Sequence, residues 1–380
     1  LQRIARHRMY VVLILTFFSM VFWTFFEQAG SSINNFTDRN VNRVVGTTRT
    51  ITAEDVGKTI AVEPTQEQLG YTWNGHLAVT EDDVDKTISV MPTEKQIGYH
   101  NADEVFSANT LAKLRSEHAG DPHFEIDWVV TKDDIGMQYK RRVFTLDVLN
   151  KLRAENKKDP KNTPDFTIDW LVSKENIGME VAPLSAEIPA SEYQSVNAVC
   201  ILVFGLAFTA LWGFLAVRGL EPSTPVKFAM GLLQLGLGFA VLWYGAHVAD
   251  ARGMVAMSWL CLAYLLHTTA ELCLSPVGLS MITKLSPMRL VSTMMGTWFL
   301  ATAYSQFLAS IVAQFTDVTK GTNLSIPPPS ETVHVYGHVW GVITLVTIIS
   351  ALICFALARK LTRWMHQEVE YDGNTSSVGH

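Results

Sequence analysis

Two glutamates within apolar stretches are the residues of this sequence best placed to do chemistry. Glu27 follows Trp23 by four residues, and Glu271 precedes Ser275 by four, so each pair shares one face of a helix. A carboxylate in a membrane helix is disfavoured by roughly 2.5–3.5 kcal/mol, and such residues usually face a bundle interior or a water-filled path. Two of them on separate spans predict a hydrated site that binds a cation or exchanges protons.

Two further residues, Pro276 and Trp298, belong to the same interpretation. Pro276 removes one backbone hydrogen bond and is expected to bend its helix, which frees carbonyls that can meet a ligand where they line a cavity. Trp298 lies midway along another apolar stretch, away from the interfacial belt where tryptophans gather. Purely structural interpretations stay open: Ser275 can bond back to a carbonyl one turn earlier, and a membrane glutamate can pair with a basic residue for assembly.

The sequence argues against several other classes of function. We find no HExxH motif and no Ser-His or paired-aspartate arrangement in the apolar stretches, so a membrane enzyme lacks support. The four cysteines lie in apolar stretches without CxxC spacing, which predicts neither a metal site nor a disulfide framework in the polar part of the chain. There is no basic patch with interleaved aromatics, so no nucleic-acid partner is expected. His247 and His267 are interpreted as packed residues of a helical bundle.

The elements that must position these residues are membrane helices. The 380-residue chain is 17% charged, whereas soluble domains average about 25%. A spanning helix needs about 20 mostly apolar residues. Six stretches qualify, at roughly 9–29, 196–217, 226–248, 254–282, 290–315 and 338–359. The first is too long for the apolar core of a signal peptide and is interpreted as a true span.

Lysine and arginine in the short flanks predict the direction of insertion. On one side of the membrane the short flanks contain only Arg252 and Lys320. The basic residues of the long polar part are not counted, because long loops translocate regardless of charge. The ten on the other side are Arg3, Arg6, Arg8, Arg218, Lys227, Lys284, Arg289, Arg359, Lys360 and Arg363. We therefore expect a multi-pass protein of the cell inner (cytoplasmic) membrane, with both termini in the cytoplasm and residues 30–195 outside.

The polar part of the chain is built from repeats. "TAEDVGKTIAVEPTQEQLGY" (52–71) recurs at 80–99, and the stretch 105–137 recurs at 143–179. In the longer repeats, Phe124, Ile126, Trp128 and Val130 alternate with polar residues, and Phe166, Ile168, Trp170 and Val172 do the same. This period of two predicts half-buried strands.

Each longer repeat also contains a predicted helix. Leu146, Leu149 and Leu152 share one stripe of a short helix. We expect small α+β units that pack against their neighbours. The repeats contain no nucleophile, acid pair or ligand cluster, which favours a spacer or interaction module and leaves substrate capture or partner docking open.

Several motifs closely resemble the C-terminal six-helix half of the proton-coupled oligopeptide transporters (POT/PTR), a family of the major facilitator superfamily. They are "FWTFFEQAGSS", "YQSVN" and "ELCLSPVGLSMITKLSP" followed by "GTWFL". The resemblance implies an all-α membrane protein of six transmembrane helices, half of a major-facilitator fold, with an inserted extracytoplasmic α+β repeat region. The expected division is a first helix (1–48), the insertion (49–190), five helices (191–365) and a cytoplasmic tail (366–380).

The function that the resemblance implies is proton-coupled uptake of di- and tripeptides by a symporter that is not an enzyme. Protons are the coupling ion and no cofactor is expected. Glu27 and Glu271 would couple protons, and Asp38 would be an outer-gate acid. The implied substrate-binding residues are Trp23, Asn197, Glu271, Ser275 and Trp298.

Two departures from the family pattern qualify this expectation. Family members have about twelve spans, and the E-x-x-E-R signature of their first half is missing here, since no Glu-Arg pair occurs in the chain. The expected partners are therefore small peptides, the lipid bilayer and a missing N-terminal six-helix half, without which the chain is not expected to transport. An alternative is a membrane-anchored extracytoplasmic interaction module that uses its helices as an anchor.

Overall fold

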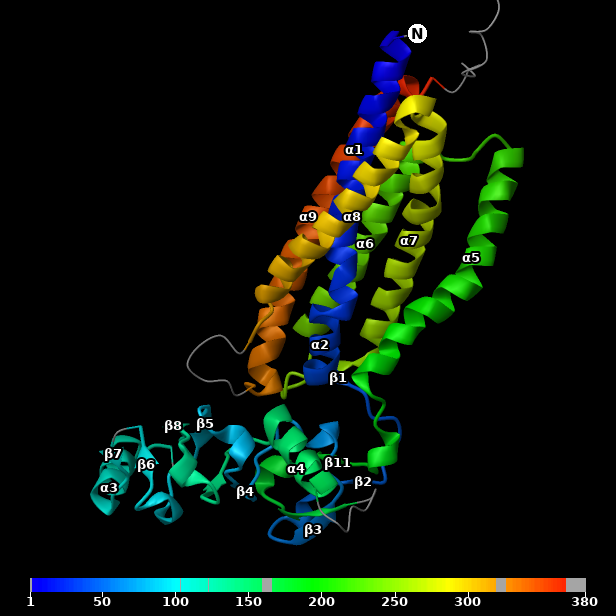
Figure 1. The fold of residues 1–380 in the computed structure, drawn as a ribbon. Helices are drawn as coiled ribbons and strands as arrows, with labels where there is room; N and C mark the ends of the chain where they lie inside the picture. Colours follow the sequence, from blue (N-terminus) through cyan, green and yellow to red (C-terminus); the bar gives the residue numbers. More distant parts are fainter. Residues whose placement is uncertain (1, 103, 122, 159–165, 319–325, 367–380) are drawn as a thin grey trace, which may run out of the picture.

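The computed structural model describes residues 2–102, 104–121, 123–158, 166–318 and 326–366. Long helices form a bundle, and the polar residues form a separate block at one end of it (Figure 1). The chain's N-terminus and the end of its last helix lie at the opposite end. Two hydrophobic cores correspond to these parts, one in the bundle and one in the block.

The bundle follows the apolar stretches of the sequence. Its helices are α1 (Gln2–Phe26), α2 (Ser32–Asn40), α5 (Gln194–Val217), α6 (Thr224–His247), α7 (Met257–Leu285), α8 (Val291–Gln314) and α9 (Pro329–Trp364). Helix α6 packs against α7 and α9, and α1 packs against α8. Aromatic side chains such as Phe22, Phe239 and Trp340 fill the centre without solvent exposure.

Five helical stretches are long and apolar enough to cross a membrane, judged by length and composition. They are Gln2–Asn40, Ala190–Val217, Thr224–His247, Met257–Leu285 and Pro329–Trp364. Each overlaps one of the predicted spans. The sixth predicted span, 290–315, is the 24-residue helix α8. It falls short of the same measure because serine, threonine, glycine and glutamine residues interrupt its apolar run.

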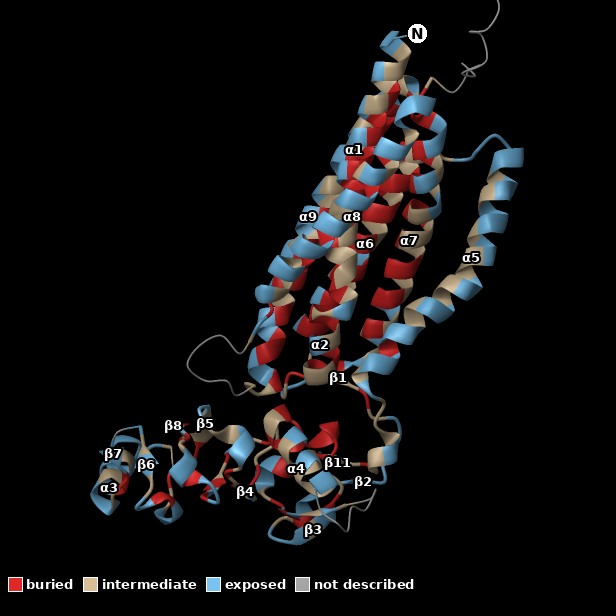
Figure 2. Ribbon diagram, in the orientation of Figure 1, coloured by how far each residue is buried: buried red, intermediate tan, exposed pale blue. Residues whose placement is uncertain are grey.

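Helix α5 stands apart from the rest of the bundle. None of its residues is buried, although it is strongly apolar. Leu202 and Leu206 are 75% and 78% exposed. The helix diverges from its neighbours toward its C-terminal end, and its surface is intermediate to exposed along its whole length (Figures 1 and 2).

The block contains two units with the same order of elements. One unit is formed by residues 76–140 and pairs β4 (His76–Ala78) with β9 (Gln138–Lys140) and β5 (Thr87–Val90) with β8 (Ile126–Val129). The other is formed by 49–72 and 143–181. It pairs β2 (Arg49–Thr50) with β11 (Glu180–Val181) and β3 (Thr59–Val62) with β10 (Ile168–Leu171). All four pairs are antiparallel. We call the unit of residues 76–140 the inserted unit. We call the unit of residues 49–72 and 143–181 the split unit.

Each unit contains one helix and short 3-10 turns. The helices are α3 (Ala108–Glu117) in the inserted unit and α4 (Leu146–Lys158) in the split unit. Six turns begin with a threonine or serine whose side chain and backbone share a capping box with the third turn residue. Capping of this kind satisfies backbone donors that a short turn leaves open.

The predicted strands and helix of the longer repeats are confirmed, but their partners differ from the expectation. Trp128 and Trp170 are buried on β8 and β10, and Leu149 is buried on α4. Instead of each repeat forming a unit that packs on its neighbour, the short repeat 52–71 pairs with the long repeat 143–179. The short repeat 80–99 pairs with 105–137. Each unit therefore needs one repeat of each kind.

The inserted unit occupies the position of a hairpin turn in the split unit. Within the inserted unit, Phe106 exchanges backbone hydrogen bonds with the Gly98–Tyr99 segment, and β6 (His100–Asn101) pairs directly with β7 (Glu104–Val105). In the split unit, Phe144 makes the equivalent bonds to the Gly70–Tyr71 segment. In the split unit, residues 73–142, which include the whole inserted unit, connect these two hydrogen-bonded segments.

Buried polar contacts hold the block to the bundle. Strand β1 (Val41–Asn42), after α2, pairs in parallel with β12 (Val255–Ala256), before α7. The Asn40 amide donates to the carbonyl oxygens of Gly253 and Pro329 at 2.9 and 2.8 Å. The buried Arg43 guanidinium lies 3.5 Å from the Glu187 carboxylate. The β1–β12 pair and the Asn40 bonds join the ends of α2, α7 and α9, and the Arg252 guanidinium ties this end of the bundle to the block by donating to the Glu67 carbonyl oxygen at 2.7 Å.

Candidate functional site

The first helix ends in a tight turn that is anchored by Gln28. Helix α1 stops at Phe26, and the 3-10 turn η1 (Glu27–Gly30) leads into α2. The buried Gln28 amide donates to the Ala309 carbonyl of α8 at 3.0 Å and accepts from the Ser32 hydroxyl at 2.6 Å. Sequence reasoning did not predict this role of Gln28. The one hint in the sequence is that an amide side chain directly follows the predicted acid in an otherwise apolar stretch.

Glu27 lies beside this anchor without a partner of its own. Its side chain is half-buried and makes no hydrogen bond or ion pair with any described residue. Because Gln28 fixes the turn against α8, Glu27 is held in place by the backbone. A carboxyl group so placed is open to a proton or an external cation.

Glu271 on α7 lies near Glu27. The charge of Glu27 acts on the Glu271 carboxyl, and the Asn197 side chain is within hydrogen-bonding reach of it. Asn197 itself accepts a 2.5 Å hydrogen bond from the Thr268 hydroxyl, one turn before Glu271. One Glu271 oxygen, Oε2, is buried without a hydrogen-bond partner among the described residues. Three of the predicted residues, Glu27, Asn197 and Glu271, are thus brought together from three elements.

Trp23 belongs to an aromatic cluster on the same helix face as Glu27. Its ring contacts those of Phe22 and Phe26, with centroids 5.6 and 5.2 Å apart. Phe26 in turn lies 6.4 Å from the ring of His267, one turn before Glu271 on α7. His267 is buried against Gly238 of α6, where a methyl group would lie 2.3 Å from the imidazole. This close contact agrees with the interpretation of His267 as a packed residue.

Ser275 and Pro276 lie one turn beyond Glu271. The Ser275 side chain makes no hydrogen bond to a described residue, so a bond back to the preceding turn is not present. Helix α7 runs through Pro276 without interruption from Met257 to Leu285. The proline removes one backbone donor inside a continuous helix, and the bend expected from the sequence leaves no break in it.

Trp298 is a buried packing residue that depends on a glycine of α7. It is 6% exposed, and its ring lies edge-on to that of Phe228 at 6.5 Å. A methyl group on Gly278 would lie 2.4 Å from the Trp298 ring, so no larger residue fits there without displacement. Sequence reasoning did not identify Gly278, because the residues around it in the sequence do not indicate that Trp298 of another helix packs against it.

Asp38 makes its contacts at the junction with the polar block. Its carboxylate lies 2.8 Å from Arg43, and its backbone oxygen accepts a hydrogen bond from Gln66. Arg43 also donates to the carbonyl oxygens of Thr37 and Ile188. The contacts of Asp38 thus tie α2 to the block, and the outer-gate role stays a prediction.

Known proteins are similar to part of this chain. A family model described as "PTR2: POT family" matches residues 175–328. Dipeptide and tripeptide permease A of Edwardsiella piscicida is 35% identical over 172 residues, which are 45% of this chain and 34% of the permease. The peptide transporter YePEPT of Yersinia enterocolitica subsp. palearctica serotype O:3 is 40% identical over 128 residues, 33% of this chain and 25% of that protein.

A solved structure is also similar in sequence. The crystal structure of a peptide transporter, POT, in complex with sulfate is 31% identical, with a TM-score of 0.40, over 48% of this chain and 33% of that one. The chain spans about a third of the length of the curated relatives it matches.

These helices and their two acids define a membrane protein with polar groups inside its bundle. The matches confirm the resemblance to the POT family that the motifs predict.

Proposed function

We propose that this chain is the C-terminal half of a proton-coupled transporter of di- and tripeptides with a major-facilitator architecture. In that architecture the substrate site lies between two halves near the bilayer midplane, and transport is the rocking of one half against the other. The observation that carries the proposal is the convergence of Glu27, Asn197 and Glu271, where α7 packs against both α1 and α5.

The chemistry of these groups suits a peptide and a proton. Glu271, with one oxygen that lacks a partner among the described residues, can accept hydrogen bonds from a peptide ammonium group, and the Asn197 side chain lies beside it. Glu27 takes and releases the coupling proton, and a basic residue of the second half pairs with it when it is ionised.

The remaining predicted residues shape the site around these acids. Trp23 offers its ring beside Glu27, and the free hydroxyl of Ser275 lies one turn from Glu271. We propose that Trp298, which packs on Gly278, shapes a pocket for a peptide side chain once the second half is present.

A second half explains the exposed surface of α5. An apolar helix without buried residues needs either lipid or protein against it. We propose that an N-terminal half covers part of this surface and supplies a basic residue that pairs with Glu27. Both termini then lie in the cytoplasm, and the polar block lies outside the inner membrane, as the flanking charges predict.

The experiment measures uptake of a labelled dipeptide into cells or vesicles with an inward proton gradient. The 380-residue chain is tested alone and with the N-terminal half of a relative supplied in trans. We expect accumulation only with both halves, and none with Glu27→Gln or Glu271→Gln. Glu192→Gln, at an exposed acid just before α5, is the matched control and should retain uptake. Uptake by the chain alone refutes the need for a second half, and normal accumulation by Glu27→Gln refutes its coupling role.

A second candidate is an interaction module that the helices anchor, and the separate core of the block favours it. That core includes Trp128, Trp170 and Phe144 and is distinct from the core of the bundle. Deletion of residues 50–185 separates the two functions. Retained uptake in the two-half system makes the block an accessory, whereas lost uptake with normal membrane insertion makes it part of the transport cycle.

A further inference from the structure

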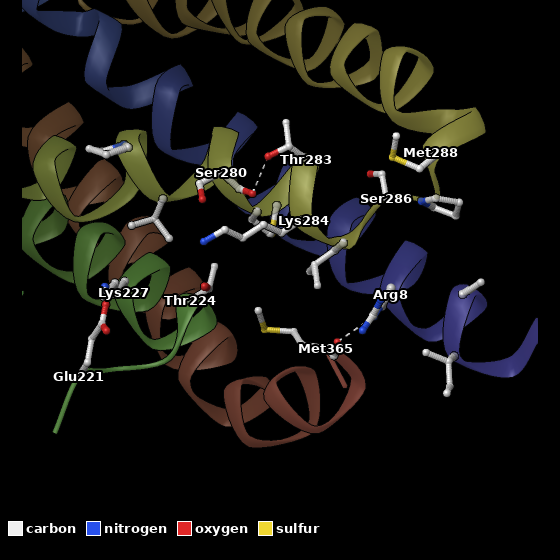
Figure 3. Close-up of a pocket in the computed structure, with 17 residues that line it drawn as sticks. Arg8, Glu221, Thr224, Lys227, Ser280, Thr283, Lys284, Ser286, Met288 and Met365 are labelled. Atoms are coloured by element: carbon white, nitrogen blue, oxygen red, sulfur yellow. Dashed lines mark hydrogen bonds and ion pairs between the residues drawn. The ribbon is translucent and has the colours of Figure 1, made fainter. Parts of the chain in front are cut away.

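A cavity with both polar and apolar lining residues lies at the end of the bundle that carries the chain's N-terminus. It measures about 630 Å³ and is walled by the beginnings of α1 and α6 and the ends of α7 and α9 (Figure 3). Of the predicted site residues, only Pro276 reaches its lining. The cavity is therefore distinct from the cluster of Glu27, Asn197 and Glu271.

Positive charge dominates this lining. Arg8, Lys227 and Lys284 contribute three cations, and Glu221 is the one acidic residue among the described residues that line the cavity. Lys227 is buried, pairs with Glu221 and lies 4.6 Å from the ring centroid of Trp212. Arg8 donates to the backbone oxygens of Met365 and His366 at 3.0 and 2.8 Å, at the end of α9. Two of the cations are thus fixed by contacts within the protein.

Lys284 is the cation that protein contacts leave available. It forms no hydrogen bond or ion pair with any residue that the structure describes. Its side chain extends into the space between α7 and α6, toward Thr224 and away from the bulk of its own helix (Figure 3). A lysine ammonium has three donors, and all three can serve a ligand here.

A buried hydroxyl in the same wall also lacks a partner. Ser286 is 8% exposed and lines the cavity, yet its Oγ atom has no hydrogen-bond partner among the described residues. Leaving a buried hydrogen-bonding group unpaired costs about 1–3 kcal/mol. A ligand acceptor that hydrogen-bonds to Ser286 Oγ would remove this cost. Ser286 is therefore an observation, independent of the charges, that points to a ligand.

The start of α6 adds a third favourable element. This 24-residue helix begins at Thr224 in the cavity wall. The first backbone N–H groups of a helix have no partner within it, and the helix dipole places partial positive charge there. Unpaired donors and cations at one place favour an anion with several acceptor oxygens.

We propose that this cavity binds a phosphate-type oxyanion, with Lys284 and Ser286 as its principal donors. The membrane is the nearest source, as the phosphate of an anionic phospholipid. Leu279 and Met288, beside the polar lining, are exposed apolar residues against which acyl chains can lie. Basic pockets between membrane helices are known to hold such head groups. That the head group belongs to the cytoplasmic leaflet rests on the orientation given under the proposed function, but the cavity does not.

The test measures lipid binding to the full 380-residue chain in detergent by native mass spectrometry. Phosphatidylglycerol is titrated against zwitterionic phosphatidylcholine, and inorganic phosphate is added in a parallel thermal-unfolding series. We expect saturable, preferential binding of phosphatidylglycerol that Lys284→Gln weakens about tenfold or more. Stabilisation by inorganic phosphate without a lipid preference assigns the same site to a free phosphate.

Arg289→Gln is the matched control. It removes one positive charge from the same end of the bundle, five residues from Lys284, at an exposed position outside the cavity lining. Its binding should match that of the unmodified chain. Equal weakening by both variants means diffuse surface attraction and overturns the proposal, as does the absence of any preference for phosphate-type anions.

Ser286→Ala provides an independent check. Because Ser286 has no partner to lose among the described residues, the variant should fold normally, keep its unfolding temperature and bind phosphatidylglycerol a few-fold more weakly. Unchanged binding by this variant removes Ser286 from the site. None of these measurements depends on transport, so failure of the proposed function leaves them intact.

Discussion

Thr268 of α7 donates a 2.5 Å hydrogen bond to the side-chain oxygen of Asn197 on α5. Because the side-chain oxygen of Asn197 accepts this bond, its amide nitrogen can donate to the Glu271 carboxyl, which lies within hydrogen-bonding distance. The bond also joins to the bundle a helix that has no buried residue. This one interhelical hydrogen bond thus holds α5 against α7 and also orients Asn197 within the polar cluster.

Asn197→Leu is expected to weaken the attachment of α5. Interhelical hydrogen bonds in membranes contribute about 0.6–2 kcal/mol, so the free energy of unfolding in mixed micelles should fall by roughly this amount. Thr209→Val is the control, because the Thr209 hydroxyl bonds only to Gly205 one turn earlier on the same helix. An equal loss for both variants would mean that the bond to Thr268 contributes nothing specific.

Gly278→Ala is expected to be destabilising because its methyl group would overlap the Trp298 ring. The added Cβ atom would lie 2.4 Å from the ring, and overpacking of this kind costs about 1–3 kcal/mol. Thermal unfolding of the purified chain measures the effect. Trp298→Leu in the same chain should recover part of the loss, as a double-mutant cycle would reveal.

Gly296→Ala tests whether this cost is specific to the contact. Gly296 lies in α8, and a methyl group added there would meet no described atom within 4 Å. Alanine favours a helix over glycine, so this variant should be neutral or slightly stabilising. Equal destabilisation at both glycines would contradict the packing explanation.

The junction between the block and the bundle should respond to pH through Glu67. Burial is the main cause that raises the pKa of Glu67 above its ordinary value of 4.5, although Asn42 donates to it at 2.8 Å. The folded state then binds the proton more tightly than the unfolded state. Its contribution to stability is full below about pH 4.5 and is lost as the pH rises through the raised pKa.

Glu67→Gln should abolish this loss, because the amide is neutral and its oxygen can still accept from Asn42. The difference in unfolding temperature between Glu67→Gln and the unmodified chain should therefore grow in favour of the variant from about pH 4.5 to about pH 8. Glu54→Gln, at an exposed acid of the same block, should give a constant difference. A constant difference for Glu67→Gln as well would show that its carboxyl is not destabilised by burial.

Features that depend on a short stretch of chain could be predicted from the sequence. The alternation around Trp128 and Trp170 predicts their strands, because a half-buried strand has a period of two wherever it packs. The leucine stripe of α4 and most membrane spans follow from the same local reasoning. Glu27 and Glu271 could be singled out because a carboxylate in an apolar stretch is costly wherever it lies.

Features that depend on distant partners could not be predicted. The repeats suggest that neighbours in sequence pack together, yet hydrogen-bonded pairing joins 52–71 to 143–179. Gln28 gains its role from the Ala309 carbonyl of another helix. In the sequence, Lys284 is recognisable only as one of several basic residues that flank the membrane spans. The cavity that it lines forms where the ends of four helices meet, which the sequence does not indicate.

Excision of the inserted unit tests the nested arrangement of the block. In this variant residues 73–142 are removed, and Thr72 is joined to Val143 by a four-residue linker with the sequence of 101–104. The spacing between Tyr71 and Phe144 then equals that between Tyr99 and Phe106. The bonds between Phe144 and the Gly70–Tyr71 segment match those between Phe106 and the Gly98–Tyr99 segment, so the new turn should close without strain. We expect the amide hydrogens of β3 and β10 to stay protected from exchange.

Deletion of residues 52–71 is the contrasting variant, because it removes one complete sequence repeat but leaves β10 without β3. It should abolish protection of the β10 amides, although fewer residues are lost than in the excision. The reason is that Trp170 is buried within a core to which both halves of the split unit contribute, including Val62 from β3. Two outcomes would contradict the nested arrangement: β10 amides that stay protected after the deletion, and β10 amides that lose protection after the excision. Either would mean that the folding unit is the sequence repeat and not the nested unit.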